Sequence, residues 1–192
     1  MSNDRKPLRM LLLSLALLSG AAAAQDIARE RQDETYWIQG RDLASLRAAL
    51  EATGPRDDGG QRHHGLARTG LGWTYGFQPE GRQCRIRDAR VLLKVAMVLP
   101  LWQDRSGAPA ALVTDWERYV AALRVHEQGH LDLADAAARR LSQALQEVIA
   151  TDCAAVQAAA DALGRAEQQA LARAQADYDR DTDHGRTQGA VL

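Results

Sequence analysis

The sequence lacks an excess of charge of either sign. Its 24 Lys and Arg residues nearly balance 25 Asp and Glu residues, and the formal net charge is −1. Residues 1–24 hold three of the basic residues and one of the acidic ones, so the rest of the chain has 21 against 24, a net charge of −3. Nucleic-acid and anionic-membrane surfaces are usually basic. We therefore expect no nucleic-acid partner and no electrostatic attraction to membranes.

The sequence has no apolar run long enough to anchor it in a membrane. Three basic residues precede the apolar run Met10–Leu18, and small residues follow it up to Ala24. This order is typical of a secretory signal peptide, whereas a membrane anchor needs about 20 apolar residues. We predict a signal peptide over residues 1–24 and one domain over residues 25–192. The mature protein is then periplasmic or secreted, without stable membrane insertion.

The sequence is also poor in cysteine. Only Cys84 and Cys153 are present, and neither belongs to a CxxC pair, so they are poor candidates for zinc ligands. An even pair in an exported chain is expected to be oxidised. We predict a disulfide that stabilises the fold by roughly 4 kcal/mol. Two free thiols are the alternative.

The pattern of apolar residues predicts an α+β fold with a small antiparallel sheet. A short strand is expected over Tyr36–Gly40 and a helix over Asp42–Thr53. Longer strands are expected over Thr69–Phe77 and Arg85–Leu99. The polar loop between the helix and these strands contains two adjacent histidines, His63 and His64, which form either a solvated pair or an accessory metal site.

The most informative motif is His126-Glu127-Gln128-Gly129-His130, an HExxH sequence in a segment with helical periodicity. Residues four apart lie on one face of a helix, so the two imidazoles can hold one metal ion. Glu127 stays beside that ion, where it can take a proton from a bound water. We predict that His126 and His130 bind Zn²⁺ and that Glu127 is the general base. Two core histidines satisfied by hydrogen bonds are the alternative.

Two long helices are expected around this motif. Thr114 and Glu117 have the spacing of a capping box, which predicts a helix from there to Ile149. Such a helix would measure about 52 Å, more than the diameter of roughly 40 Å expected of a compact domain, so we expect a bend or break near Gly129. A second helix over Asp152–Ala176 would return as an antiparallel hairpin.

The helical hairpin predicts where a third metal ligand lies. If the chain turns near Thr151, the segment after Ala176 returns to the HExxH motif, and His184 is the best ligand in it. Asp181 and Asp183 are the nearest substitutes. Glu147, on the same helix as the motif, would lie about 25 Å from His130 and is excluded.

A family resemblance rests on four features. These are the N-terminal leader, the HEQGH sequence, the two cysteines and the tail Tyr178-Asp179-x-x-Thr182-x-His184-Gly185-x-x-Gln188-Gly189-Ala190. Together they resemble a bacterial family named domain of unknown function 922 and described as predicted secreted zinc-dependent proteases. The resemblance implies a zincin-like fold, and it implies that Tyr178, Thr182 and His184 belong to the site.

The expected function is therefore that of a zinc metallopeptidase acting on a peptide or protein substrate. Glu127 would activate water, and Tyr178 would donate a hydrogen bond to the developing oxyanion. Trp73 or Tyr75 would line the cleft, and an extended substrate would add to a sheet edge. The alternatives are a non-catalytic zinc-binding envelope protein and a metal-free envelope protein that docks through its alanine-rich helices.

Overall fold

A computed structural model describes residues 26–192, and its central element is the 20-residue strand β4 (Gln83–Trp102). Strand β3 (Leu66–Glu80) forms a long antiparallel hairpin with it. Strands β1 (Ile27–Arg31) and β2 (Glu34–Ile38) pair with β4 one after the other, and β5 (Ile149–Ala150) pairs with its beginning. The predicted signal peptide lies outside the described residues.

The prediction of an antiparallel sheet is wrong, because the sheet is mixed. Strands β1 and β2 run parallel to β4, and β3 and β5 run antiparallel to it. A hairpin is a local arrangement that a short connection indicates, whereas parallel neighbours require a crossover that joins distant segments. The pairing of β1 and β2 with β4 bridges more than 60 residues of chain, and no local pattern predicts it.

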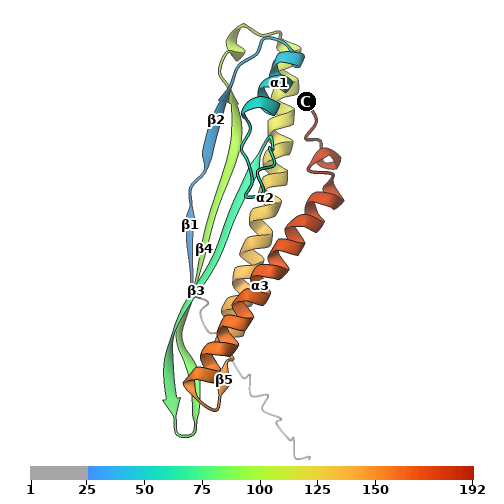
Figure 1. Ribbon diagram of the computed structural model, residues 1–192. Coiled ribbons are helices and arrows are strands. Elements are labelled where there is room, and N and C mark those ends of the chain that lie inside the picture. The colour runs from blue at the N-terminus through green and yellow to red at the C-terminus, as the bar shows by residue number, and fades with distance from the viewer. Residues whose placement is uncertain (1–25) are drawn as a thin grey trace, which may run out of the picture.

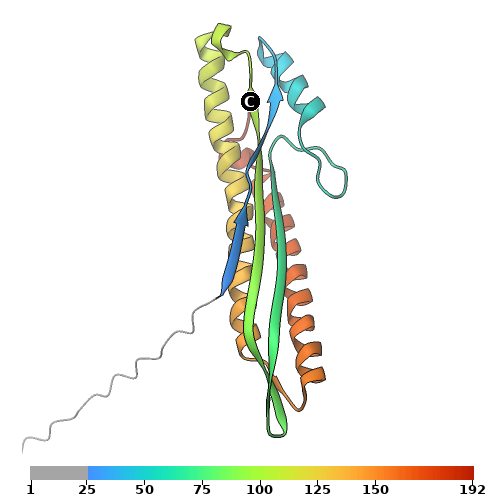
Figure 2. The ribbon, with the colours of Figure 1, turned by 90° about the vertical axis from the view of Figure 1, so that its left-hand side faces the viewer.

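Two long antiparallel helices cover one face of the sheet, so the molecule has two layers and is elongated (Figures 1 and 2). They are α2 (Ala110–Gln146) and α3 (Cys153–Thr182), and they form the predicted hairpin. The short helix α1 (Leu43–Thr53) lies at the end of the molecule where β2 ends. Two single turns, η1 (Arg105–Gly107) and η2 (Arg186–Gln188), complete the elements.

Helix α2 differs from the prediction at its start and in its middle. The capping box at Thr114 and Glu117 is wrong: the helix begins at Ala110 after Pro109, and the Thr114 hydroxyl donates to the Ala110 carbonyl. The helix also continues through Gly129 without a break. Its 37 residues span about 55 Å. The expected break assumed a compact domain, but the long β3–β4 hairpin supports the helix along its length (Figure 1).

The core follows the apolar stripe of α2 in two clusters. One contains Leu141 and Leu145 with Val91 of β4 and Val156 of α3, and the other contains Tyr119 and Leu123 with residues of α1 and β4. The predicted disulfide between Cys84 and Cys153 is confirmed, and it joins β4 to the first residue of α3. Among residues 26–192, no helix combines the length and apolar character that a membrane crossing requires.

Candidate metal centre

His126 and His130 occupy successive turns of α2 on its buried side. They are 4% and 8% exposed, and Glu127 between them is 4% exposed. The Nε2 atoms of the two histidines are 3.2 Å apart. Since residues at i and i+4 share a helix face, the two rings meet without distortion of the helix. The predicted convergence of the two imidazoles is therefore present.

Two glutamine side chains determine which nitrogen of each ring is protonated. Oε1 of Gln175 accepts from Nδ1 of His130, and Oε1 of Gln188 accepts from Nδ1 of His126 at 3.0 Å. The amide of Gln175 donates to the His130 carbonyl, which can only accept, and this contact fixes the orientation of the Gln175 side chain. The amide of Gln188 donates to the Tyr178 hydroxyl. Nδ1 of each ring is thus bonded to a glutamine, and Nε2 of each ring is directed at Asp179.

Asp179 completes a cluster of three ligand atoms. Its Oδ1 atom lies 3.1 Å from Nε2 of both His126 and His130. Burial alone would raise the pKa of Asp179, but hydrogen bonds with the two histidines outweigh it and hold this pKa well below its usual range. A tetrahedral zinc ion with ligands at about 2.0–2.1 Å separates them by roughly 3.3 Å. The spacing and the donor types of this cluster fit zinc.

Glu127 lies beside the cluster and is held by the beginning of β3. Burial raises the pKa of Glu127, while the nearby histidines and the backbone N–H of Ala67 oppose the increase. A Cβ on Gly65 would lie 2.6 Å from Oε1 of Glu127, so glycine lets the main chain approach this carboxylate closely. The role of Glu127 as general base stays a prediction.

His184, the predicted third ligand, lies just outside the cluster. Its Nδ1 atom is 3.6 Å from Oδ1 of Asp179, and its side chain is 58% exposed. The three groups whose ligand atoms all lie within 4.8 Å of one another are His126, His130 and Asp179. The role of His184 as a ligand stays a prediction, and the structure adds Asp179 at the position where this third ligand was expected.

Tyr178 packs behind the histidines. Its ring stacks on His126 with centroids 5.1 Å apart and meets His130 edge-on. Its hydroxyl lies against the Cα side of Gly129 and accepts from Gln188. The catalytic role predicted for this residue stays a prediction, since its contacts are those of a residue that holds His126 in place. The Thr182 hydroxyl, also expected in the site, lies 3.4 Å from Nδ1 of His126.

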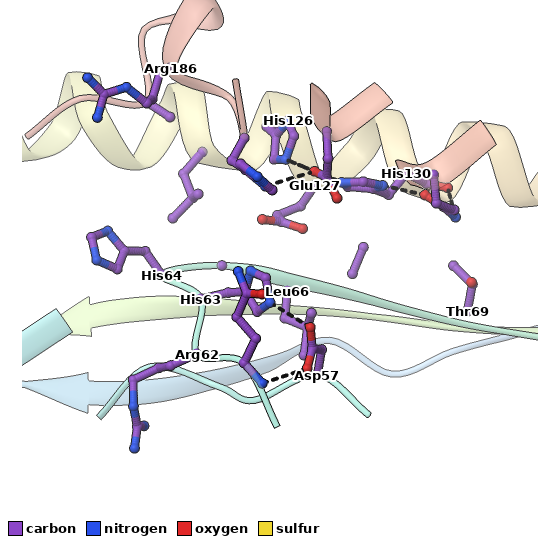
Figure 3. Close-up of a pocket in the computed structure, with 18 of the residues that line it drawn as sticks. Asp57, Arg62, His63, His64, Leu66, Thr69, His126, Glu127, His130 and Arg186 are labelled. Atoms are coloured by element: carbon purple, nitrogen blue, oxygen red, sulfur yellow. Dashed lines mark hydrogen bonds and ion pairs between the residues drawn. The ribbon is translucent and has the colours of Figure 1, made fainter. Parts of the chain in front are cut away.

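The cluster opens into a cavity of about 450 Å³ (Figure 3). His126, Glu127 and His130 form one wall, and the loop before β3 forms the opposite wall with Asp57, His63, His64 and Arg62. Nε2 of His63 lies 3.0 Å from Asp57, and Nδ1 of His64 lies 2.7 Å from the Tyr119 hydroxyl. The two loop histidines are partly exposed, contact Asp57 and Tyr119, and line this cavity.

Trp73 and Tyr75, expected to line the cleft, lie elsewhere. The Tyr75 hydroxyl donates to Oδ1 of Asp161 in α3 at 3.0 Å, and the Trp73 indole N–H donates to the same atom at 3.4 Å. Neither residue lines the cavity beside the metal cluster. Their position further along β3 places them under the first half of α3, where they form part of the interface between the sheet and the helices.

The sequence analysis gave no site role to Asp179, Gln175 or Gln188, although the family tail motif contains Asp179 and Gln188. The 175/179 spacing would have revealed two of them, because residues four apart share a helix face, but α3 was expected to end at Ala176. Arg140 pairs with Glu167, and His130 meets Asp179, so the hairpin is centred about three residues after Thr151. The connection through β5 extends past the end of α2 before α3 returns, and this shifts the register.

The fold and this cluster define a mixed α/β protein with a candidate metal centre on a HExxH helix. The chain belongs to the family described as bacterial protein of unknown function (DUF922), whose model matches residues 33–185. The resemblance in the sequence is thus confirmed, and the description of the family names no activity. No curated protein matches the chain. No solved structure matches it either.

Proposed function

We propose that this protein is a zinc-dependent hydrolase that cleaves peptide bonds outside the cytoplasm. One observation carries the proposal: Nε2 of His126, Nε2 of His130 and Oδ1 of Asp179 converge within 3.2 Å of one another. Since both Nδ1 atoms are bonded to glutamines, the Nε2 atoms are the ring nitrogens available to a metal ion, which would take the place of the proton that they share with Asp179. Once deprotonated, the three atoms present facing lone pairs, and a cation among them offsets their repulsion.

Zinc bound there would supply a Lewis acid that polarises a carbonyl group and makes water a better nucleophile. Glu127 is placed to take the proton of that water and then to pass it to the leaving amine. Its burial raises its pKa, which suits a group that must both accept and return a proton. The Ala67 N–H and the close approach of Gly65 keep its carboxylate at the edge of the cavity.

The buried Glu127 favours hydrolysis over the second candidate, a zinc-binding protein without turnover. A carboxylate that is 4% exposed and is not needed as a ligand costs stability through desolvation. Such a cost is typical of groups that perform chemistry. A metal-free envelope protein would have no need for the converging lone pairs.

The substitution Glu127→Gln tests this proposal, with Glu117→Gln as a matched control. Glu117 lies on the same helix but is exposed and pairs with Arg105. Each variant is loaded with zinc, its zinc content is measured by mass spectrometry, and its cleavage of denatured casein is followed. We expect full zinc content in both and at least a 100-fold slower cleavage in Glu127→Gln alone. Undiminished cleavage by zinc-loaded Glu127→Gln would show that another group is the base.

The proposed location follows from the predicted signal peptide. Fractionation of cells that express the full chain with a C-terminal tag should recover a shortened protein in the periplasm or the medium. Recovery of the full-length chain in the cytoplasm would contradict it.

A further inference from the structure

The outer edge of β3 has no strand partner among residues 26–192, since β3 pairs only with β4. The hydrogen bonds of β4 determine which backbone groups of β3 point to its free edge. Odd-numbered residues of β4 bond to the opposite side, because Val95 accepts from Gln32 and Met97 donates to Asp33. Even-numbered residues of β4 therefore face β3, and their partners there are also even-numbered. The odd-numbered residues of β3 thus direct their N–H and C=O groups to the free edge.

One side-chain contact confirms this alternation independently: the C=O of Leu71 accepts from the Gln168 side chain of α3 at 2.8 Å. At the other end of the segment, the N–H of Ala67 faces Glu127 of α2 and lowers its pKa. Between these contacts, the free edge presents the C=O of Ala67, both backbone groups of Thr69 and the N–H of Leu71. These groups have no hydrogen-bond partner within the described part of the chain.

This edge segment lies along the cavity of the metal cluster. Ala67 and Thr69 line that cavity together with His130, Gln175 and Asp179. The edge carries unpaired backbone groups next to a hollow, whereas a free edge is usually protected by charge, proline or a covering element. From Leu71 onward α3 supplies such a cover, with Trp73 packed against Gly164. The open part is therefore short, and it begins beside Glu127.

We propose that the β3 edge from Ala67 to Leu71 binds the substrate as an added strand, so that the substrate class is an unfolded or extended polypeptide segment. The inference rests on the proposed function insofar as it places the bond to be cleaved beside Glu127. The added strand bonds to Thr69 through its backbone, and its alternate side chains point into the cavity. Recognition is then directed at the peptide backbone and tolerates many side chains. Because Gln168 and α3 cover the edge from Leu71 onward, only a short segment of the substrate can bind to it.

Amide hydrogen exchange tests the edge without turnover. The N–H groups of Thr69 and Leu71 should exchange rapidly in zinc-loaded Glu127→Gln protein, because they lack partners. Addition of a peptic digest of casein should slow both at least about tenfold, while the amides on the outer edge of β2 keep their rates. Equal protection at both edges would indicate non-specific strand addition and would overturn the proposal.

The substitution Thr69→Pro removes the outward N–H and leaves the hydrogen bonds to β4, since proline is tolerated on an edge strand. Thr69→Val is the matched control, because it removes the hydroxyl and keeps the N–H. We expect cleavage of denatured casein to be about tenfold or more slower in Thr69→Pro than in Thr69→Val, with equal zinc content. The same test can be made with the wild-type protein. A peptide that it cleaves is synthesised in several versions, each with a single N-methylated amide at a different position. We expect the version methylated at one of these positions to resist cleavage.

The outcomes separate the edge from the hydrolysis. If casein is cleaved but Thr69→Pro matches Thr69→Val and no N-methyl group matters, the edge proposal is wrong and the proposed function stands. If nothing is cleaved but the Thr69 and Leu71 amides are protected by peptides, the edge stands as a peptide-binding surface and the hydrolysis is wrong. Neither cleavage nor protection would overturn both.

Discussion

The Tyr178 ring lies parallel to the His126 imidazole, with an interplanar angle of 9° and centroids 5.1 Å apart. The tyrosine reaches this position because Gly129, one turn along α2, has no side chain in its way. The backbone of α2 therefore admits an aromatic ring from α3 directly behind the metal cluster, and the ring fixes one face of His126.

We predict that Gly129→Ala weakens zinc binding and destabilises the fold. A Cβ at this position would lie 2.1 Å from the Tyr178 hydroxyl oxygen and 2.4 Å from Cζ. Alanine favours a helix by about 1 kcal/mol, but the overlap displaces Tyr178 and costs about 1–3 kcal/mol. Urea unfolding measures the free energy of unfolding, and competition with a chelator measures the zinc affinity.

The control for this prediction is Gly164→Ala. Its Cβ would lie 2.2 Å from the ring of Trp73, in the same kind of overlap between a helix and an aromatic ring. Because Trp73 lies outside the cavity, this variant should lose similar stability and keep its zinc affinity. Equal zinc affinity in both variants would contradict the role given to Tyr178.

The second prediction concerns the glutamines that orient the histidines. Gln188→Ala removes the acceptor for Nδ1 of His126 and the donor to Tyr178, so zinc affinity should fall about 10–100-fold. Gln128→Ala is the control, because this glutamine lies within the HExxH sequence but contacts Asp132 on the outer side of α2. A chelator competition that gave the same affinity for both variants would refute the assignment.

The third prediction decides between the two candidates for the third ligand. Asp179→Ala should reduce zinc affinity by more than about 100-fold, since Asp179 contacts both histidines directly. His184→Ala should reduce it by less than about tenfold, and the exposed Asp181→Ala should leave it unchanged. An equal loss in Asp179→Ala and His184→Ala, measured by calorimetry, would support both as ligands.

The fourth prediction concerns pH. Burial alone would lower the pKa of His130, but hydrogen bonds with Asp179 and Gln175 outweigh it and raise this pKa. Zinc must displace that proton, so its affinity is full above the raised pKa and falls as the pH decreases through it, about tenfold per pH unit for one proton. Asp179→Asn removes the main partner of His130, and the decline should then begin at a lower pH. A zinc affinity independent of pH between 5 and 8 would contradict this coupling.

The sequence predicted the elements that depend on local pattern. The β3–β4 hairpin, the two long helices, the disulfide and the pair formed by His126 and His130 follow from periodicity and spacing alone. The parallel pairing of β1 and β2 with β4 could not be predicted in this way, because the paired segments lie more than 60 residues apart. The expected kink at Gly129 was wrong for a related reason. It assumed a compact shape, and shape depends on how far the sheet extends.

The site was predictable only on one helix. The ligands of α2 share a single helix face, whereas Asp179 depends on the register between two helices. That register depends on the connection through β5, where a few extra residues shift the partners of α2 along α3 by about six residues, more than one helical turn. Gln188 lies beyond the end of α3, shares no helix face with the ligands, and is identified only from the atoms that it contacts.

Gly65 touches Glu127 and stands one residue before β3 begins. The main chain that confines the Glu127 carboxylate is thus continuous with the edge of β3 that we propose for the substrate. A shift of His64–Leu66 would move both at once, so the proposed substrate binding and the proposed proton abstraction would be linked through three residues.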